Sequence, residues 1–117
     1  MGIPPVLRVV FFRSQSGREP VRQWSLDLSR DDRKAIGCDI KTAQYGWPLG
    51  MPLIRKLEPG LWEVRSTIDR GIARTIFTVE EDVMILLHGF VKKSARTPST
   101  DLQVARDRRS KLRGCHD

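Results

Sequence analysis

Four short segments in the middle of the chain, joined by very short turns, restrict the folds that the sequence can adopt. The segments are rich in apolar and β-branched residues and cover residues 51–57, 61–67, 72–79 and 83–90. The residues between them are typical of turns: Pro59-Gly60, Asp69-Arg70-Gly71 and Glu80-Glu81-Asp82. Connections this short pair consecutive strands antiparallel, because a parallel connection needs a longer crossover. The sequence therefore predicts a four-stranded antiparallel meander.

The segments on either side of the meander add one strand and three helices. Residues 5–12 are rich in β-branched and aromatic side chains, which indicates a first strand. A helical hairpin of roughly 25 residues is predicted to follow, because apolar residues recur along one face of each helix. These stripes are Val21, Trp24 and Leu28 in the first helix and Ile36, Ile40 and Ala43 in the second. Ser29 and Asp32 resemble a capping box at the start of the second helix.

A last helix is predicted after Pro98, with Thr97 as its N-cap. It would dock on the sheet through Leu102, Ala105 and Leu112. The expected order of elements is thus β-α-α-β-β-β-β-α, a small α+β domain with a twisted, mostly antiparallel sheet and helices packed on it. The 117 residues fit a single domain, residues 1–117.

Positive charge exceeds negative charge and is concentrated towards the C-terminus. The chain has 21 Lys and Arg residues against 14 Asp and Glu residues, a net charge of +7. From residue 92 onward there are eight basic and three acidic residues, a net of +5, so the first 91 residues contribute only +2. A basic domain of this size suggests a polyanionic partner, most often nucleic acid. The partner surface is therefore expected to involve the C-terminal third.

Nothing in the sequence suggests export or a membrane. The N-terminus lacks a basic region followed by a long apolar stretch, and no apolar run approaches the roughly 20 residues of a membrane helix. The two cysteines, Cys38 and Cys115, do not indicate a disulfide-rich secreted protein. We expect a cytoplasmic protein with no membrane partner.

Strand alternation assigns side chains to the two faces of the sheet. In residues 61–67, Trp62 and Val64 are assigned to the core face, and Glu63 and Arg65 to the other. Arg74 lies in the next strand, which a short turn brings beside the strand of Arg65. The two arginines are therefore expected to lie near each other.

The basic residues of the meander are predicted to form one concave, cationic sheet surface. Alternation along the last strand places five side chains on one face: Met84, Leu86, His88, Phe90 and Lys92. Further basic residues lie on the first strand of the meander or just after its last strand: Arg55, Lys56, Lys93 and Arg96.

Each candidate also has an ordinary structural explanation. A strand arginine such as Arg65 is usually solvated or ion-paired, here with Glu63. His88 is more often a partly buried, hydrogen-bonded residue than a general acid or base, although histidine titrates near neutral pH. The basic C-terminal helix is either a solvated face or a surface that binds phosphates. Its phosphate-binding candidates are Arg106, Arg109 and Arg113.

Motifs for other kinds of site are missing from the sequence. There is no Walker A motif, dinucleotide fingerprint or nucleophile elbow. The two Cys and two His residues do not have the spacing of a zinc site, and paired carboxylates for a two-metal nuclease are not evident. We therefore expect neither a metal nor a cofactor.

Three segments taken in order resemble a known family. They are "LIRKLEPGLWEVRS", "RTIFTV" and "ILLHGFVKKSARTPSTDLQVARDRR". Together they resemble the HigB-like, phage-derived (Gp49-like) branch of the RelE/ParE toxin superfamily. The N-terminal "VVFFRSQSGREPVRQWSLDL" is similar to the family's opening strand, turn and helix. The resemblance covers nearly the whole chain and implies a RelE-like fold.

The resemblance implies a toxin of a type II toxin–antitoxin system. Many members of the family are endoribonucleases that cut mRNA on the ribosome, so the resemblance implies a ribosome-dependent mRNA endoribonuclease that cleaves by attack of the 2′-OH on the adjacent phosphorus, without a metal. Its implied partners are mRNA, the ribosome and a cognate antitoxin of the helix-turn-helix type.

The resemblance also assigns roles to individual residues. Arg65 matches an arginine of the central strand, and Arg74 matches the arginine associated with the scissile phosphate. Lys92 and Lys93 match the basic pair after the last long strand. The RelE type carries lysines just before the strand arginine and a C-terminal tyrosine, which this chain lacks. The identity of the general base therefore stays open, with His88 as the candidate substitute if it faces the site.

Two other functions remain open at this stage. One is a ParE-like toxin without nuclease activity that binds a protein target such as DNA gyrase. The other is a non-toxic nucleic-acid-binding domain. A neighbouring gene for a helix-turn-helix protein would favour either toxin over the third function, and RNA cleavage assays would separate the two toxins.

Overall fold

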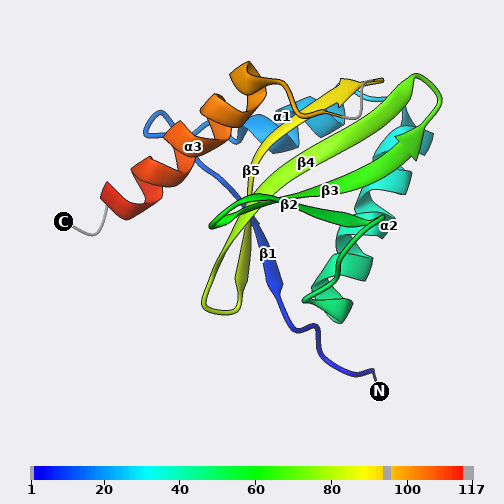
Figure 1. Ribbon diagram of the computed structural model, residues 1–117, viewed down its shortest axis with the longest axis horizontal. Helices are drawn as coiled ribbons and strands as arrows, with labels where there is room; N and C mark the ends of the chain where they lie inside the picture. The colour runs from blue at the N-terminus through cyan, green and yellow to red at the C-terminus, as the bar shows by residue number, and fades with distance from the viewer. Residues whose placement is uncertain (1, 94–95, 115–117) are drawn as a thin grey trace.

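The computed structural model describes residues 2–93 and 96–114, and its elements follow the predicted order β-α-α-β-β-β-β-α (Figure 1). The elements are β1 (Arg8–Phe11), α1 (Pro20–Leu26), α2 (Arg30–Gly46), β2 (Ile54–Glu58), β3 (Leu61–Ile68), β4 (Gly71–Glu80), β5 (Val83–Lys92) and α3 (Ser99–Gly114). The first strand is shorter than the predicted residues 5–12, because pairing with the sheet begins only at Arg8.

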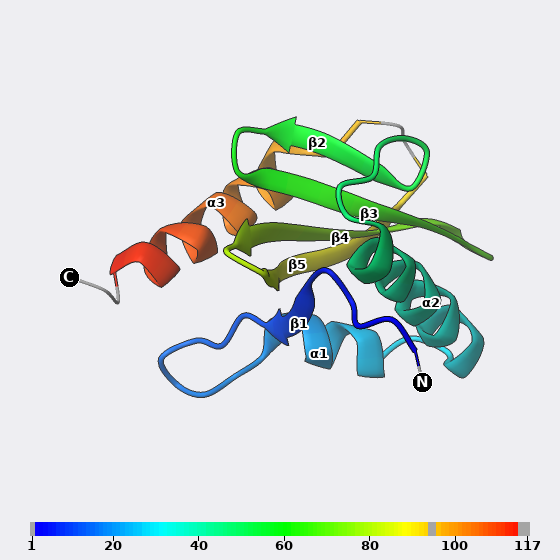
Figure 2. The ribbon, with the colours of Figure 1, turned by 90° about the horizontal axis from the view of Figure 1, so that it is seen from below.

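The five strands form one open sheet in the order β1-β5-β4-β3-β2. Strands β2 to β5 pair antiparallel with their neighbours in the sequence, as the short turns predict. Strand β1 pairs with β5 in parallel, with Arg8 opposite Val83. Figure 2 shows the strands in this order across the sheet. The predicted class, α+β with a mostly antiparallel sheet, is confirmed.

The two N-terminal helices cover different strands. The hydroxyl of Ser29 accepts a 3.1 Å hydrogen bond from the backbone N–H of Asp32, which caps α2 as predicted. Helix α1 packs on β5 and β1, whereas α2 packs on β3. An apolar groove of about 250 Å³, whose lining includes Val21, Trp24 and Ile36, lies between them. A packed helical hairpin is therefore not confirmed.

Helices on both sides of the sheet create two core layers. The layer beneath α1 and α2 contains Leu7, Val21, Ala43, Ile54, Val64, Phe77, Met84 and Leu86. The layer beneath α3 contains Phe12, Leu61, Ile76, Ile85, Leu87, Phe90 and Ala105, with Leu102 and Leu112 packed against them. The predicted docking of the last helix is confirmed. The central strands are buried on both faces, so the α3 side is a covered layer rather than an open surface.

A β-bulge in β5 interrupts the regular alternation of its side chains. Ile76 of β4 lies opposite His88, but the next residue, Phe77, lies opposite Leu86. Leu87 is thus an additional residue on β5 that has no opposite partner. Beyond Leu87, each side chain of β5 therefore points to the opposite face of the sheet from the one that simple alternation predicts.

This bulge corrects one prediction made from the sequence. Met84 and Leu86 belong to the layer beneath α1 and α2, whereas Phe90 belongs to the layer beneath α3. His88 stacks on Phe90, with ring centroids 5.6 Å apart, and therefore also lies on the α3 side. The prediction that Met84, Leu86, His88, Phe90 and Lys92 share one face is wrong, because alternation does not continue through the additional residue.

Gly89 in β5 lies directly beneath the Trp24 side chain of α1. A Cβ added at Gly89 would collide with the indole ring of Trp24. We expect Gly89→Ala to lower the free energy of unfolding by about 1–3 kcal/mol, because a packed ring must move. Gly37→Ala in α2 is the matched control, since its Cβ would meet nothing within 4 Å. Alanine there should instead raise stability by roughly 0.5–1 kcal/mol.

Urea denaturation of the two variants measures both effects. A Gly89→Ala protein as stable as the unsubstituted one would show that Trp24 does not pack on this strand.

The length and apolarity of the helices bear on membrane crossing, and the state of the cysteines bears on disulfide formation. Across the described residues, no helix is both long enough and apolar enough to cross a membrane. Cys38 is exposed with a free thiol, and Cys115 lies outside the described residues.

Candidate functional site

Three arginines from neighbouring strands lie close together on the sheet face that α3 covers. Arg65 of β3 is directly opposite Arg74 of β4. Arg55 of β2 is directly opposite Glu63, which precedes Arg65 by two residues and so shares its face. We call Arg55, Arg65 and Arg74 the arginine cluster. The structure brings Arg65 and Arg74 together, as the short turn between their strands predicts.

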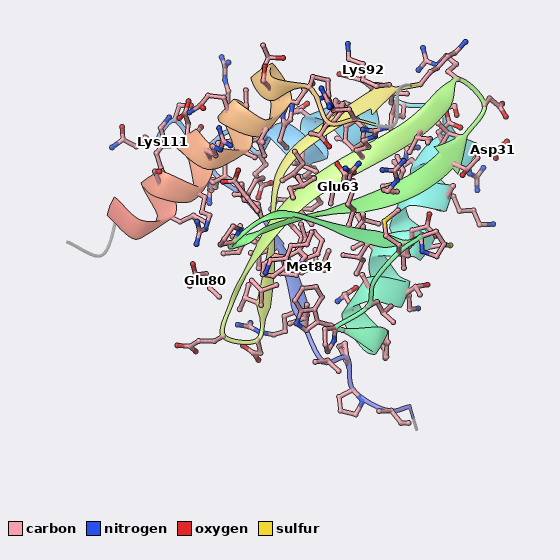
Figure 3. The ribbon with its side chains drawn as sticks, viewed as in Figure 1. Asp31, Glu63, Glu80, Met84, Lys92 and Lys111 are labelled. Carbon is pink, nitrogen blue, oxygen red and sulfur yellow. The ribbon has the colours of Figure 1, made fainter. Side chains whose placement is uncertain are left out.

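Glu63 lies within this cluster, and its side chain has no exposed surface. Its Oε2 lies 3.3 Å from Nη1 of Arg65, and its Oε1 accepts a 2.8 Å hydrogen bond from the Thr97 hydroxyl. Thr97 was predicted to cap the last helix, but its hydroxyl binds this carboxylate and α3 begins at Ser99. Figure 3 shows Glu63 near the middle of the molecule. A buried carboxylate needs such compensation from charges and donors.

Arg74 is the most deeply buried member of the cluster, with no exposed surface. Burial lowers the pKa of its guanidinium, and the Glu63 carboxylate opposes that shift. The nearby positive charges of Arg65 and Arg55 lower the pKa further. The guanidinium carbon also lies 5.9 Å from the centre of the Phe90 ring, where a cation–π attraction operates. An anion and an aromatic ring thus hold a guanidinium that stays charged at any physiological pH.

The like charges of the cluster favour an anion among them. Like charges on directly opposite strand residues destabilise a sheet, and the Cβ atoms of such residues are about 5 Å apart. The Glu63 carboxylate, which pairs with Arg65 and acts electrostatically on Arg74, offsets this repulsion. Glu63 therefore makes the opposition of Arg65 and Arg74 tolerable.

His88 connects the sheet to α3. Its Nε2 lies 2.7 Å from Oδ1 of Asp101, and its Nδ1 lies 3.4 Å from Nη1 of Arg108. The same Arg108 nitrogen donates a 2.8 Å hydrogen bond to the carbonyl oxygen of Leu87. Arginine has only donors, so Nδ1 is the acceptor and Nε2 carries the proton that is donated to Asp101. Both ring nitrogens thus bind protein groups, which suits an anchor for α3 better than a general base.

The end of β5 and the residues after it carry accessible positive charge. Lys92, Lys93 and Arg96 are exposed. Figure 3 shows Lys92 at the far end of β5, away from Glu63. The side chain of Lys93 lies beside Gly71 in the β3–β4 turn, because a Cβ at Gly71 would be 3.3 Å from its Cγ. These cations can meet a polyanion in the present conformation, whereas Arg74 cannot.

The basic residues of α3 divide between docking and exposure. Arg106 forms a hydrogen-bonded ion pair with Glu58 of β2. The Nε and Nη2 atoms of Arg106 lie 3.0 Å and 2.6 Å from Oε1 of Glu58. This hydrogen-bonded ion pair lowers the pKa of Glu58 and raises that of Arg106. The guanidinium of Arg109 lies against Gly60 in the β2–β3 turn, while Lys111 is exposed on α3 (Figure 3). Two of the three predicted phosphate-binding arginines therefore contact the β2–β3 hairpin.

The remaining predicted residues lie apart from the cluster or outside the description. Lys56 is exposed but is opposite Trp62, which packs in the layer beneath α1 and α2, so it lies on the other side of the sheet from Arg55. The side chain of Arg113 lies outside the described residues. In the part of the chain that the structure describes, no group of three His, Cys, Asp or Glu residues could hold a metal ion.

Sequence reasoning did not identify Glu63, Thr97 and Asp101 as part of this arrangement. It treated Glu63 only as a surface ion-pair partner of Arg65. The sequence signal that could have revealed the burial of Glu63 was its position inside the apolar strand "LWEVRS". The neighbours of Glu63 in this strand pack in both core layers. When both faces of a strand are covered, a charged side chain in the strand becomes buried and needs an opposite charge or hydrogen bonds to compensate it.

Comparison with known families identifies a match over most of the chain. The family model described as phage derived protein Gp49-like (DUF891) matches residues 23–110, which is most of the chain. The matched segment contains all three members of the arginine cluster as well as Glu63 and His88. A search of curated proteins finds no significant match.

Proposed function

This chain belongs to the phage-derived Gp49-like family (DUF891), a toxin-like family, and from that premise we propose that it is the toxin of a toxin–antitoxin pair. We further propose that it is an endoribonuclease which cleaves mRNA on the ribosome, in the cytoplasm. RelE-like ancestry and the residue roles implied by it are part of the same proposal.

The observation that carries this function is the arginine cluster. Arg65 and Arg74 are held opposite each other on rigid strands, and exposed Lys92, Lys93 and Arg96 extend the positive charge from the end of β5. Fixed cations of this kind suit a phosphate whose negative charge grows during a reaction. They also suit the flanking phosphates of a single strand.

In the proposed reaction the ribose 2′-OH attacks the adjacent phosphorus to form a 2′,3′-cyclic phosphate, and the bond from phosphorus to the 5′ oxygen breaks. The 2′-OH proton passes to water, and the leaving 5′ oxygen takes a proton from water. Arg65, whose side chain is 14% exposed, is the cluster member that meets the nonbridging oxygens. Arg74 lies directly opposite it on β4 and contributes its charge from a fully buried position. Lys92 and Lys93 bind the neighbouring phosphates. His88 holds α3 in place through Asp101.

Ribosome dependence follows from the chemistry that this site offers. The cluster supplies cations, but His88, the candidate base, is bound through both ring nitrogens. Catalysis must then depend strongly on RNA held in an attack-ready geometry, and orientation can supply roughly 7–11 kcal/mol in favourable cases. A ribosome provides such geometry.

We expect the purified protein to cleave mRNA in an initiated ribosome complex efficiently and the same mRNA without ribosomes weakly. Both substrates are compared at two salt concentrations, with new 5′ ends mapped by primer extension. Cleavage should decline as salt rises, because docking releases counterions from phosphates. Equal cleavage of both substrates would contradict ribosome dependence.

The proposed partner in the cell is an antitoxin of the helix-turn-helix type. A chain with a net charge of +7 is attracted to an acidic protein and associates with it quickly at low salt. The antitoxin would thus contribute acidic surface.

One observation favours a second function, a toxin that binds a protein target. Arg74 has no exposed surface, and His88 is engaged by both Asp101 and Arg108. A closed layer of this kind can be purely structural, with the exposed lysines serving a protein interface. Toxicity in cells without cleavage of either RNA substrate would favour this second function.

A further inference from the structure

Glu63 lies within the arginine cluster, yet the reaction proposed above gives it no part. Its side chain is fully buried, so it does not reach RNA. Its two oxygens nevertheless bind different parts of the site. Oε2 pairs with the guanidinium of Arg65 on β3, and Oε1 accepts the hydroxyl hydrogen of Thr97, two residues before α3.

We propose that Glu63 is a positioning residue, whose charge fixes the guanidinium groups of Arg65 and Arg74 in the geometry that receives a phosphate. The kinetic consequences rest on the proposed RNA cleavage, whereas the arrangement itself is a property of the free protein.

The charges around Glu63 explain why a carboxylate is needed at this place. Arg65 and Arg74 are directly opposite each other, and Arg55 stands opposite Glu63 on the other side of β3. Three positive groups would otherwise spread apart as far as their side chains allow. The negative charge of Glu63 attracts the guanidinium groups and so holds them close together despite their mutual repulsion. Cations stabilise a developing charge best when they are already fixed before the reaction begins.

Glu63→Gln tests the role of the charge. Glutamine keeps the size of the side chain and an oxygen that can accept the Thr97 hydroxyl hydrogen, but it is neutral. We expect kcat to fall roughly 10–100-fold, because small displacements of a fixed group have effects of that size. We expect KM not to rise, since loss of a negative charge strengthens the attraction of the site for RNA.

The split between kcat and KM separates positioning from a merely structural role. A residue that only stabilises the fold would reduce the folded fraction and leave kcat per folded molecule unchanged. Activity is therefore normalised to the folded fraction, which thermal unfolding measures for each variant.

A second measurement uses the free protein and needs no RNA. In ¹⁵N-labelled protein, the guanidinium Nη–H signal of Arg65 should be sharp and slow to exchange, because Nη1 pairs with Glu63, and Glu63→Gln should broaden it. Glu58→Gln is the matched control, because it removes the same charge from a carboxylate that pairs with Arg106 outside the cluster. That control should alter the signal of Arg106 and leave the signal of Arg65 unchanged.

Two results with Glu63→Gln would overturn the proposal. One is an unchanged kcat per folded molecule together with an unchanged Arg65 signal. The other is a raised kcat, which would mean that Glu63 competes with phosphate for the arginines.

Failure of the proposed function can be distinguished from failure of this inference. If the unsubstituted protein cleaves no RNA, the nuclease function is wrong, and the Arg65 signal alone decides the positioning role. If Glu63→Gln does not fold, Glu63→Asp and Thr97→Val replace it, since each disturbs one part of the arrangement. Both should broaden the Arg65 signal partially, and a sharp signal in both would overturn the proposal.

Discussion

Replacing Arg65 with alanine is expected to slow RNA cleavage by roughly 10²–10³-fold while the protein remains folded. The Arg65 side chain is 14% exposed and pairs with Glu63, so its loss removes a fixed cation from the point where phosphate arrives. The variant loses the ion pair of the buried Glu63, which lowers stability, but the hydrogen bond from Thr97 and the nearby charge of Arg74 remain and limit that loss. Initial rates on ribosome-bound mRNA, together with circular dichroism, measure the two quantities.

Two variants serve as controls for Arg65→Ala. Lys41→Ala removes the same charge from an exposed position on α2, across the sheet from the cluster, and should leave the rate unchanged. Arg65→Lys keeps the charge but loses the planar fork of donors, so it should give an intermediate rate. Full activity in a folded Arg65→Ala protein would remove Arg65 from the site.

Arg74→Ala is expected to abolish cleavage and to lower the free energy of unfolding by about 3–5 kcal/mol. The side chain is completely buried, so its removal leaves a cavity beside Phe90. It also deprives the buried Glu63 of a nearby positive charge. Activity and stability should thus fall together for Arg74, whereas they separate for Arg65.

Urea denaturation measures the stability of Arg74→Ala, and Arg70→Ala is its control, because Arg70 is an exposed arginine in the β3–β4 turn. Arg70→Ala should unfold at the same urea concentration as the unsubstituted protein. An Arg74→Ala protein of unchanged stability would show that the buried charges of the cluster are not coupled.

The sequence predicted the features of the fold that depend on local patterns. Short turns determined the antiparallel order of β2 to β5, and the hydroxyl of Ser29 caps α2 as its spacing from Asp32 indicates. The apolar positions Leu102 and Ala105 dock α3 as expected. These features involve residues close together in the sequence, so one segment contains the information needed.

The features that the sequence did not predict depend on contacts between distant segments. The additional residue Leu87 reverses the alternation in β5, and nothing in "ILLHGF" distinguishes a bulge from a regular strand. The burial of Glu63 and Arg74 arises because α3 covers the face opposite α1 and α2. Polar residues that alternate with apolar ones are equally compatible with a solvated face and with a covered, charge-paired layer.

The position of β1 in the sheet affects the sequence of events during synthesis. Arg8 pairs opposite Val83, so the strand that leaves the ribosome first has to wait for β5, which is made last among the strands. Closing so long a loop costs entropy that only the finished meander can offset. Until then the apolar side of β1 stays uncovered and can attach to other chains, a risk that its length of four residues keeps small. The strand that is synthesised first, β1, is therefore the one that pairs with the sheet last.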